Sequence, residues 1–225
     1  MYKFLKRFLD ILISLAALLI LAPLLIPIMI GLRLTGEGFI FYKQKRIGFN
    51  RKYFYILKFA TMLKDSPNIG TGSITLKNDP RVTLMGGFLR KTKINELPQI
   101  FNILIGDISL VGPRPLVDRT FSAYSKEVQD KIYNIKPGLT GIGSIVFRDE
   151  EALVSAFEGD PHEFYSSKIA PYKGALEMWY QKNASFFLDL KLIFLTAWVV
   201  FFSNSQLPFR LLKGVPSRPD FLITS

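Results

Sequence analysis

The chain has 225 residues, with 29 Lys and Arg against 18 Asp and Glu, a formal net charge of +11 and a mean hydropathy of +0.24. This length suits one domain with a hydrophobic core, and a hydrophobic content of 49% excludes a disordered chain. The basic charge calls for an anionic partner, and the positive mean hydropathy favours a membrane surface over nucleic acid.

The absence of cysteine excludes disulfides, zinc–thiolate sites and a thiol nucleophile. The single histidine, His162, excludes a histidine-rich metal site and is expected to be structural or exposed. Any catalysis is therefore expected to use carboxylates, Lys and Arg.

Residues 11–32 form an uncharged apolar segment that is long enough to cross about 30 Å of hydrocarbon. Pro23 and Pro27 interrupt it, and basic residues flank both of its ends. Because cytoplasmic flanks collect Lys and Arg, both ends are expected on the same side of the membrane. The segment therefore predicts a re-entrant hairpin that breaks at Pro23, and the alternative is a kinked single span.

The remaining elements are predicted from hydrophobic periodicity and from Gly and Pro positions. Residues 185–202 form a second apolar run with charges near its start, which we expect to lie along the interface, although a second span is an alternative. In chain order, we expect a strand hairpin at 36–62, a loop at 64–78, a helix at 95–105 that Gly106-Asp107 ends, an ordered turn at 111–115, a helix at 119–133, a turn at 136–141 and a helix at 168–183.

Several charged positions have both a functional and a structural interpretation. Arg114 between two prolines is either a rigid anion clamp or an exposed turn residue, and the basic stretch before the helix at 95–105 is either a phosphate site or a solvated face. Asn95 at the start of that helix is either chemically active or simply its N-cap. Asp149-Glu150-Glu151 is either a cation site or a solvated helix start.

Seven strings occur in the order found in the bacterial sugar transferases, and nearly the whole chain resembles a small monotopic polyprenyl-phosphate phosphoglycosyl transferase of that family. They are EGFIFYKQKRIG (37–48), KFATM (58–62), DPRVT (79–83), LRKT (89–92), NELPQ (95–99), GDISLVGPRP (106–115) and PGLTG (137–141).

The resemblance implies an enzyme that moves a sugar-1-phosphate from a UDP-sugar to undecaprenyl phosphate with release of UMP, which initiates glycan assembly. It also implies Mg²⁺ as cofactor, contact with membrane lipids at the cytoplasmic face of the bacterial inner membrane, and a membrane helix broken at Pro23. No nucleic-acid partner is expected, and a homo-oligomer is left open. The expected fold is α/β but mostly helical. It has a re-entrant segment (1–34), a catalytic domain (35–184) and a C-terminal interfacial amphipathic helix with a tail (185–225).

In this family an Asp-Glu pair carries the chemistry, and the aligned pair here is Asn95-Glu96. An amide is a poor nucleophile, so three outcomes stay open. Another carboxylate replaces the Asp, with Glu96 as first candidate and one of Asp149-Glu150-Glu151 as the other; or the lipid phosphate attacks directly; or the chain is a catalytically impaired homologue that serves as a membrane scaffold or regulator. The resemblance assigns catalysis to Glu96, Asn95 and Lys58, the metal to Glu96, and substrate contacts to the following residues: Arg90, Arg114, Asp107 and Lys136.

Overall fold

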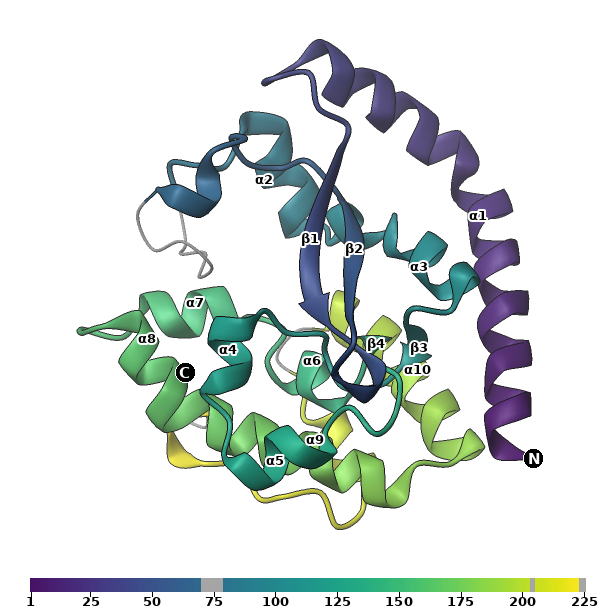
Figure 1. Cartoon of the computed structure of the whole chain (residues 1–225), viewed down its shortest axis with the longest axis vertical. Helices are drawn as coiled ribbons and strands as arrows, with labels where there is room; N and C mark the ends of the chain where they lie inside the picture. The colour runs from purple at the N-terminus through teal and green to yellow at the C-terminus, as the bar shows by residue number, and fades with distance from the viewer. Residues whose placement is uncertain (70–78, 203–204, 223–225) are drawn as a thin grey trace.

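The computed structural model describes residues 1–69, 79–202 and 205–222, and this part of the chain is mostly helical with two small sheets (Figure 1). The mostly helical class is therefore as predicted. The predicted loop at 64–78 lies partly outside the described residues. Its described portion includes a 3₁₀ turn (Ser66–Asn68).

Helix α1 (Tyr2–Leu34) is one continuous helix of 33 residues that contains Pro23 and Pro27. It runs along one side of the molecule and bends partway along its length (Figure 1). Each proline removes one backbone donor and crowds the preceding turn, which bends a helix without ending it. Among the described residues, α1 is the one helix long and apolar enough to cross a membrane. Only 17% of its most apolar 18-residue stretch is buried in the protein. The structure thus has a bend where the sequence predicted a hairpin.

Strands β1 (Phe41–Ile47) and β2 (Tyr53–Phe59) pair antiparallel, which confirms the strand hairpin predicted at 36–62. The register places Tyr42 opposite Lys58 and Arg46 opposite Phe54. Because side chains alternate between the two faces of a strand, Arg46 and Lys58 lie on the same face of this ribbon.

The helix predicted at 95–105 is shorter in the structure. Helix α2 (Leu84–Lys91) comes first, then a 3₁₀ turn (Ile94–Glu96), and α3 (Gln99–Ile105) follows, with Pro98 at its N-cap position. The proposed N-cap role of Asn95 is therefore wrong. Pro98 has no N–H for an α-helical bond to residue 94, so the chain turns with three-residue bonds such as Leu97 N–H to the Ile94 carbonyl (3.0 Å). Gly106 ends α3 in the left-handed region, as predicted.

The expected turn at 136–141 contains a strand. Strand β4 (Gly138–Thr140) pairs parallel with β3 (Ser109–Val111). The two backbones approach so closely that a Cβ at Gly112 would lie 2.4 Å from the Lys136 carbonyl oxygen, and one at Gly138 would lie 2.1 Å from the Gly112 nitrogen. Only glycine fits at either position, and the missing side chains are why the strand pattern is absent from the sequence.

The helix predicted at 119–133 is two helices, α4 (Asp118–Ser122) and α5 (Lys126–Lys131). The hydroxyl of Ser125 accepts from the Val128 N–H and caps the second helix, so the chain restarts there.

The C-terminal part of the chain contributes α6 (Ile142–Val146), α7 (Glu150–Ser155), α8 (Pro161–Phe164), a π-helical segment (Tyr165–Ile169), α9 (Ala170–Asn183), α10 (Phe186–Phe201) and α11 (Leu207–Leu211). Helix α9 confirms the helix predicted at 168–183. Helix α10 buries one face, which includes Leu192 and Leu195, against the same core as α6 and α9.

Two groups of buried apolar side chains hold these elements together. The first, which we call the small core, joins α1 to β2 and α2, and its buried members are Leu25, Ile28, Leu32, Phe59 and Leu89. The second, the large core, is formed chiefly by residues 110–199, and its fully buried side chains include Tyr133, Ile142, Ile169, Leu176, Tyr180, Leu192 and Leu195.

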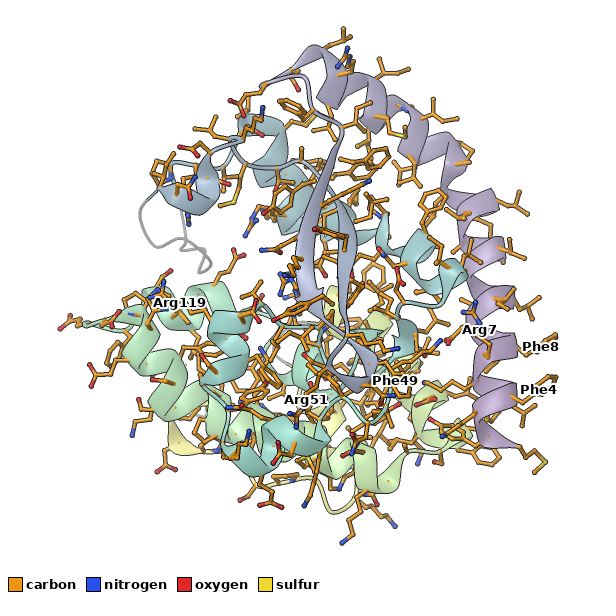
Figure 2. The ribbon with its side chains drawn as sticks, in the orientation of Figure 1. Phe4, Arg7, Phe8, Phe49, Arg51 and Arg119 are labelled. Atoms are coloured by element: carbon orange, nitrogen blue, oxygen red, sulfur yellow. The ribbon has the colours of Figure 1, made fainter. Side chains whose placement is uncertain are left out.

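Polar contacts tie the first turns of α1 to the rest of the molecule. Lys6 Nζ donates to Asp189 of α10 (2.7 Å), and Arg7 donates to two carbonyl oxygens at the end of α3 (2.6 and 2.7 Å). Asp10, also buried, accepts from the Leu110 N–H of β3 (2.9 Å). Figure 2 shows Arg7 on the inner side of α1, whereas Phe4 and Phe8 project away from the protein and are 76% and 57% exposed.

Candidate functional site

A cavity of about 580 Å³ lies between the small core and the large core. Its walls are the β1–β2 ribbon, the end of α1, α2, the 3₁₀ turn Ile94–Glu96, the turn around Arg114, and parts of α7, the π-helical segment and α9. The cavity is therefore built from segments far apart in the sequence.

Glu96 is the centre of the ion pairs in this cavity. Its Oε1 accepts from Lys58 Nζ (2.8 Å) and from the Arg114 guanidinium (2.9 Å), and all three side chains are at least partly buried. Arg46 lies on the same ribbon face as Lys58, donates to Gln44 and to the Pro115 carbonyl (3.0 Å), and also lines the cavity.

The protonation states follow from burial and from these charges. Burial alone would raise the pKa of Glu96, but Arg114 and Lys58 outweigh it and hold this pKa well below its usual range. Burial lowers the pKa of Lys58 to about 8 and that of Arg46 to about 10, with Arg114 adding to both effects. Glu96 raises the pKa of Arg114. At neutral pH Glu96 is therefore an anion and its three neighbours are predominantly cations.

Arg46, Lys58 and Arg114, which we call the cation group, all interact with the Glu96 carboxylate, and Glu150 also interacts electrostatically with Arg114. Of the described residues that line the cavity, eight are Lys or Arg and four are Glu, which leaves an excess of positive charge that a partly buried site tolerates poorly. A ligand with two or more negative charges, such as a diphosphate, would neutralise the excess, and guanidinium groups suit phosphate oxygens.

Asn95 is buried at 7% exposure and lines the same cavity. Its Oδ1 has no hydrogen-bond partner in the described part of the protein. At the position where the family that the sequence resembles has an aspartate, this chain therefore has an amide whose carbonyl oxygen is available as a hydrogen-bond acceptor or a ligand.

Arg90 also lines the cavity, but it pairs with Glu151 of α7. Glu150 pairs with Lys173 of α9, and Asp149 pairs with its neighbour Arg148. Among the described residues no group of three Asp, Glu, His or Cys side chains could hold a metal ion, so the idea of a cation site at 149–151 is wrong. Each of these carboxylates has a basic partner instead.

Asp107 and Lys136 lie outside this cavity. Asp107 Oδ2 accepts from the Asn102 side-chain amide (3.1 Å), and Lys136 Nζ donates to the Gly106 carbonyl (2.7 Å). A Cβ at Gly106 would lie 3.3 Å from both Lys136 Nζ and the Arg7 guanidinium. Lys136 and the neighbour of Gly106, Asp107, therefore lie at the junction between the end of α3 and α1. The structure therefore places Asp107 and Lys136 apart from the other predicted site residues, and their contact with substrate stays a prediction.

Of the predicted site residues, the structure brings together Lys58, Arg90, Asn95, Glu96 and Arg114. Pro23 is exposed on α1, and His162 lies in α8 at the edge of the fold, where its N–H donates to Asp160 (3.0 Å).

Sequence reasoning missed Arg46 and Lys173 as lining residues of the cavity. Pairing the two strands of the predicted hairpin would have placed Arg46 on the same face as Lys58. Lys173 lies in a helix far along the chain, and no local pattern marks it.

Comparisons with known proteins agree on one group. The sequence model described as "Bacterial sugar transferase" matches residues 1–203. The chain is 34% identical over 196 residues to an undecaprenyl-phosphate glucose phosphotransferase of Komagataeibacter xylinus, covering 85% of this chain and 35% of that protein. It is 34% identical over 212 residues to an undecaprenyl-phosphate galactose phosphotransferase of Salmonella typhimurium, covering 88% and 40%.

The chain thus spans well under half the length of those two relatives. It is also 33% identical over 205 residues to the exopolysaccharide production protein ExoY of Rhizobium meliloti, covering 85% of this chain and 83% of that protein.

Proposed function

Because the chain belongs to the bacterial sugar transferase family, we propose that it transfers a sugar-1-phosphate from a UDP-sugar to undecaprenyl phosphate and thereby initiates glycan assembly. The observation that carries this proposal is the excess positive charge around Glu96 in a cavity of about 580 Å³. Both proposed substrates are phosphate anions, and two of the relatives are named as undecaprenyl-phosphate sugar phosphotransferases.

The reaction needs alignment and charge stabilisation more than it needs unusual covalent chemistry. An oxygen nucleophile forms a bond to the phosphorus that bears the sugar, the bond from that phosphorus to the bridging oxygen breaks, and UMP leaves with that oxygen. The cation group stabilises the charge that develops on the phosphate oxygens and on UMP. Glu96 keeps Lys58 and Arg114 turned toward each other before substrate binds.

We favour the lipid phosphate as the nucleophile. Asn95 has no anionic oxygen, and Glu96 is held by two cations that lower its pKa, which makes its carboxylate a weak nucleophile. The route through a covalent phospho-sugar on Glu96 is the alternative. It predicts release of one UMP per protein in the absence of lipid.

The donor set is compatible with Mg²⁺ that arrives with the nucleotide. Glu96 offers one carboxylate and Asn95 a carbonyl oxygen without a partner, both on the same cavity wall. Mg²⁺ commonly binds through one or two protein oxygens together with substrate phosphates and water. The metal would supply further neutralisation of the diphosphate, and the cation group makes its binding without nucleotide unfavourable.

The membrane placement of this site is also part of the proposal. The outer face of α1 exposes Leu19 (78%) and Ile20 (76%), and α10 exposes Phe187 (75%) on the side away from the large core. Such surfaces suit a bilayer. We propose that the exposed apolar face of the bent α1 lies in the cytoplasmic leaflet of the inner membrane, and that the cavity stands at the cytoplasmic face.

The test is UMP release by purified protein in nanodiscs with Mg²⁺, undecaprenyl phosphate and a panel of UDP-sugars, measured for the wild type, Glu96→Gln, Glu150→Gln and Asn95→Asp. We expect release that requires the lipid and is lost in Glu96→Gln. Absence of release with every sugar, combined with recovery in Asn95→Asp, would instead indicate a chain that has lost its nucleophile and serves as a scaffold or regulator.

A further inference from the structure

One buried carboxyl close to the cavity has no role in the reaction described so far. Glu177 of α9 is 1% exposed, and no donor of the described residues reaches either of its carboxyl oxygens with full hydrogen-bond geometry. A buried polar group left in this state is costly and calls for an explanation.

The surroundings of Glu177 are shaped to hold it. A Cβ at Gly143 of α6 would lie 2.3 Å from Glu177 Oε1, so the carboxyl occupies the space where a side chain at position 143 would otherwise lie. Lys173, one turn earlier on α9, is 3% exposed, and its ammonium pairs with Glu150 and lies 5.3 Å from the Phe147 ring centre. The carboxyl therefore lies behind two cations that line the cavity, Lys173 and Arg114.

Glu177, Lys173 and Arg114 form a cluster whose net charge changes near neutral pH. Burial raises the pKa of Glu177 to about 7, while the Lys173 charge, the backbone N–H of Arg114 and the Arg114 charge oppose the increase. Further titratable groups that interact electrostatically with this cluster come from the segments packed around it, and they are Tyr124, Tyr133, Tyr165 and Glu150. Because burial raises the pKa of each of these tyrosines, Glu177 is the group of this cluster that titrates near pH 7.

We propose that Glu177 is a positioning residue of the transfer reaction, whose carboxyl, seated against Gly143, holds the Arg114 turn and Lys173 where the phosphates of the substrate bind. This inference rests on the proposed function. Its consequence is a linkage between anion binding and protonation. A diphosphate at Arg114 neutralises a cation that stabilises the Glu177 carboxylate, so binding raises the affinity of Glu177 for a proton.

The experiment is calorimetry of UDP binding to the full chain in nanodiscs, in pairs of buffers with different ionisation enthalpies, at pH 7 and pH 9. The wild type is compared with Glu177→Gln, Glu177→Asp and Gly143→Ala, and Glu158→Gln serves as the matched control because Glu158 is exposed and outside the cavity. UMP release is measured on the same preparations, and thermal unfolding checks that each variant is folded.

At pH 7 we expect the wild type to take up as much as about half a proton more than Glu177→Gln, with no such difference at pH 9. We expect the dissociation constant of UDP to rise about tenfold in Glu177→Gln and Gly143→Ala, in the range reported for the loss of supporting groups around a site. Glu177→Asp should restore most of the proton uptake, and Glu158→Gln should match the wild type.

Equal proton uptake by the wild type and a folded Glu177→Gln would overturn the inference, even if UMP release is normal. A wild type that shows the pH-dependent uptake but transfers no sugar phosphate would leave the inference standing and contradict the proposed function. Should Glu177→Gln fail to fold, the measurement is made on Lys58→Arg, in which position 58 does not titrate, and the absence of proton uptake at pH 7, after allowance for the titration of UDP itself, would overturn the inference.

Discussion

The two walls of the cavity differ in how they are stabilised. The wall on the side of the small core carries Lys58 and Glu96 and rests on five buried apolar side chains, three of them from α1. The wall on the side of the large core carries Arg114 and Lys173 and rests on a much larger buried group. One wall therefore depends on the apolar N-terminal helix, whereas the other has its own core.

Among the described residues, two ion pairs join these walls across the cavity, Glu96 with Arg114 and Arg90 with Glu151. The first pair is largely shielded, whereas Glu151 is about half exposed at 47%. Because solvent screens the second pair, the first should dominate the coupling between the walls. The end of α1 packs in the small core, whereas its first turns contact α10 and β3 on the side of the large core, so a shift of the end of α1 should disturb the small-core wall first.

The largest effect is expected where the two walls meet. Glu96→Gln should lower kcat/KM for UMP release by roughly a hundredfold to a thousandfold, because both cations lose their shared partner. Asp107→Asn, outside the cavity, should stay within about threefold of the wild type in the same assay. A comparable loss in both variants would contradict the assignment of the site to this cavity.

The unequal cores can be compared by removing one fully buried leucine from each. Leu192→Ala in the large core should lower the free energy of unfolding by about 2–5 kcal/mol, as judged by denaturant titration in detergent. Leu89→Ala in the small core should cost less in that titration but should reduce UMP release, because only one wall of the cavity moves. A larger loss of unfolding free energy in Leu89→Ala than in Leu192→Ala, with the larger loss of UMP release in Leu192→Ala, would show that the two cores are not independent.

The pH dependence of kcat/KM reports on the small-core wall. As the pH rises through about 8, Lys58 loses its proton and the cation group loses one charge, so activity should fall up to about tenfold for each further pH unit. Lys58→Arg keeps its charge at these pH values and should retain activity at pH 9. An unchanged alkaline limb in Lys58→Arg would assign that limb to another group.

The smallest effect is expected from the exposed pair between the walls. Glu151→Gln removes the partner of Arg90 and should change kcat/KM by no more than about threefold, since an exposed ion pair contributes about 0–1 kcal/mol. A lower KM for the UDP-sugar would show that Glu151 competes with substrate phosphate for Arg90. A loss larger than that of Glu96→Gln would invert the proposed order of the two pairs.

The elements predicted well from sequence are those with local signals. The alternating pattern of the β1–β2 ribbon, the helix at α9 and the end of α3 at Gly106 all follow from periodicity and from glycine. The 3₁₀ turn before α3 was missed because the effect of Pro98 on the preceding backbone bonds outweighed an otherwise helical pattern. Strand β4 was missed because its pairing depends on a close backbone approach that no side-chain pattern records.

The candidate site was predictable to the extent that its residues lie in recognisable strings. Lys58, Glu96 and Arg114 were identified in this way, and the structure places them in contact. Asp107 lies in such a string too, yet it faces the junction of α3 with α1, because a string gives the order of residues and not the direction of each side chain. Glu177 gave no sequence signal, since its significance comes from burial alone.

The central claim is that the cation group binds two phosphorylated substrates and promotes transfer between them. Its most direct test is mass spectrometry of the lipid extract after incubation with undecaprenyl phosphate, Mg²⁺ and the UDP-sugar that gives the most UMP. We expect a sugar linked to undecaprenyl diphosphate in a 1:1 ratio to UMP, and roughly a hundredfold less product or lower with Glu96→Gln. UMP formed without the lipid-linked sugar would instead indicate hydrolysis and would show that the cation group does not promote transfer to the lipid.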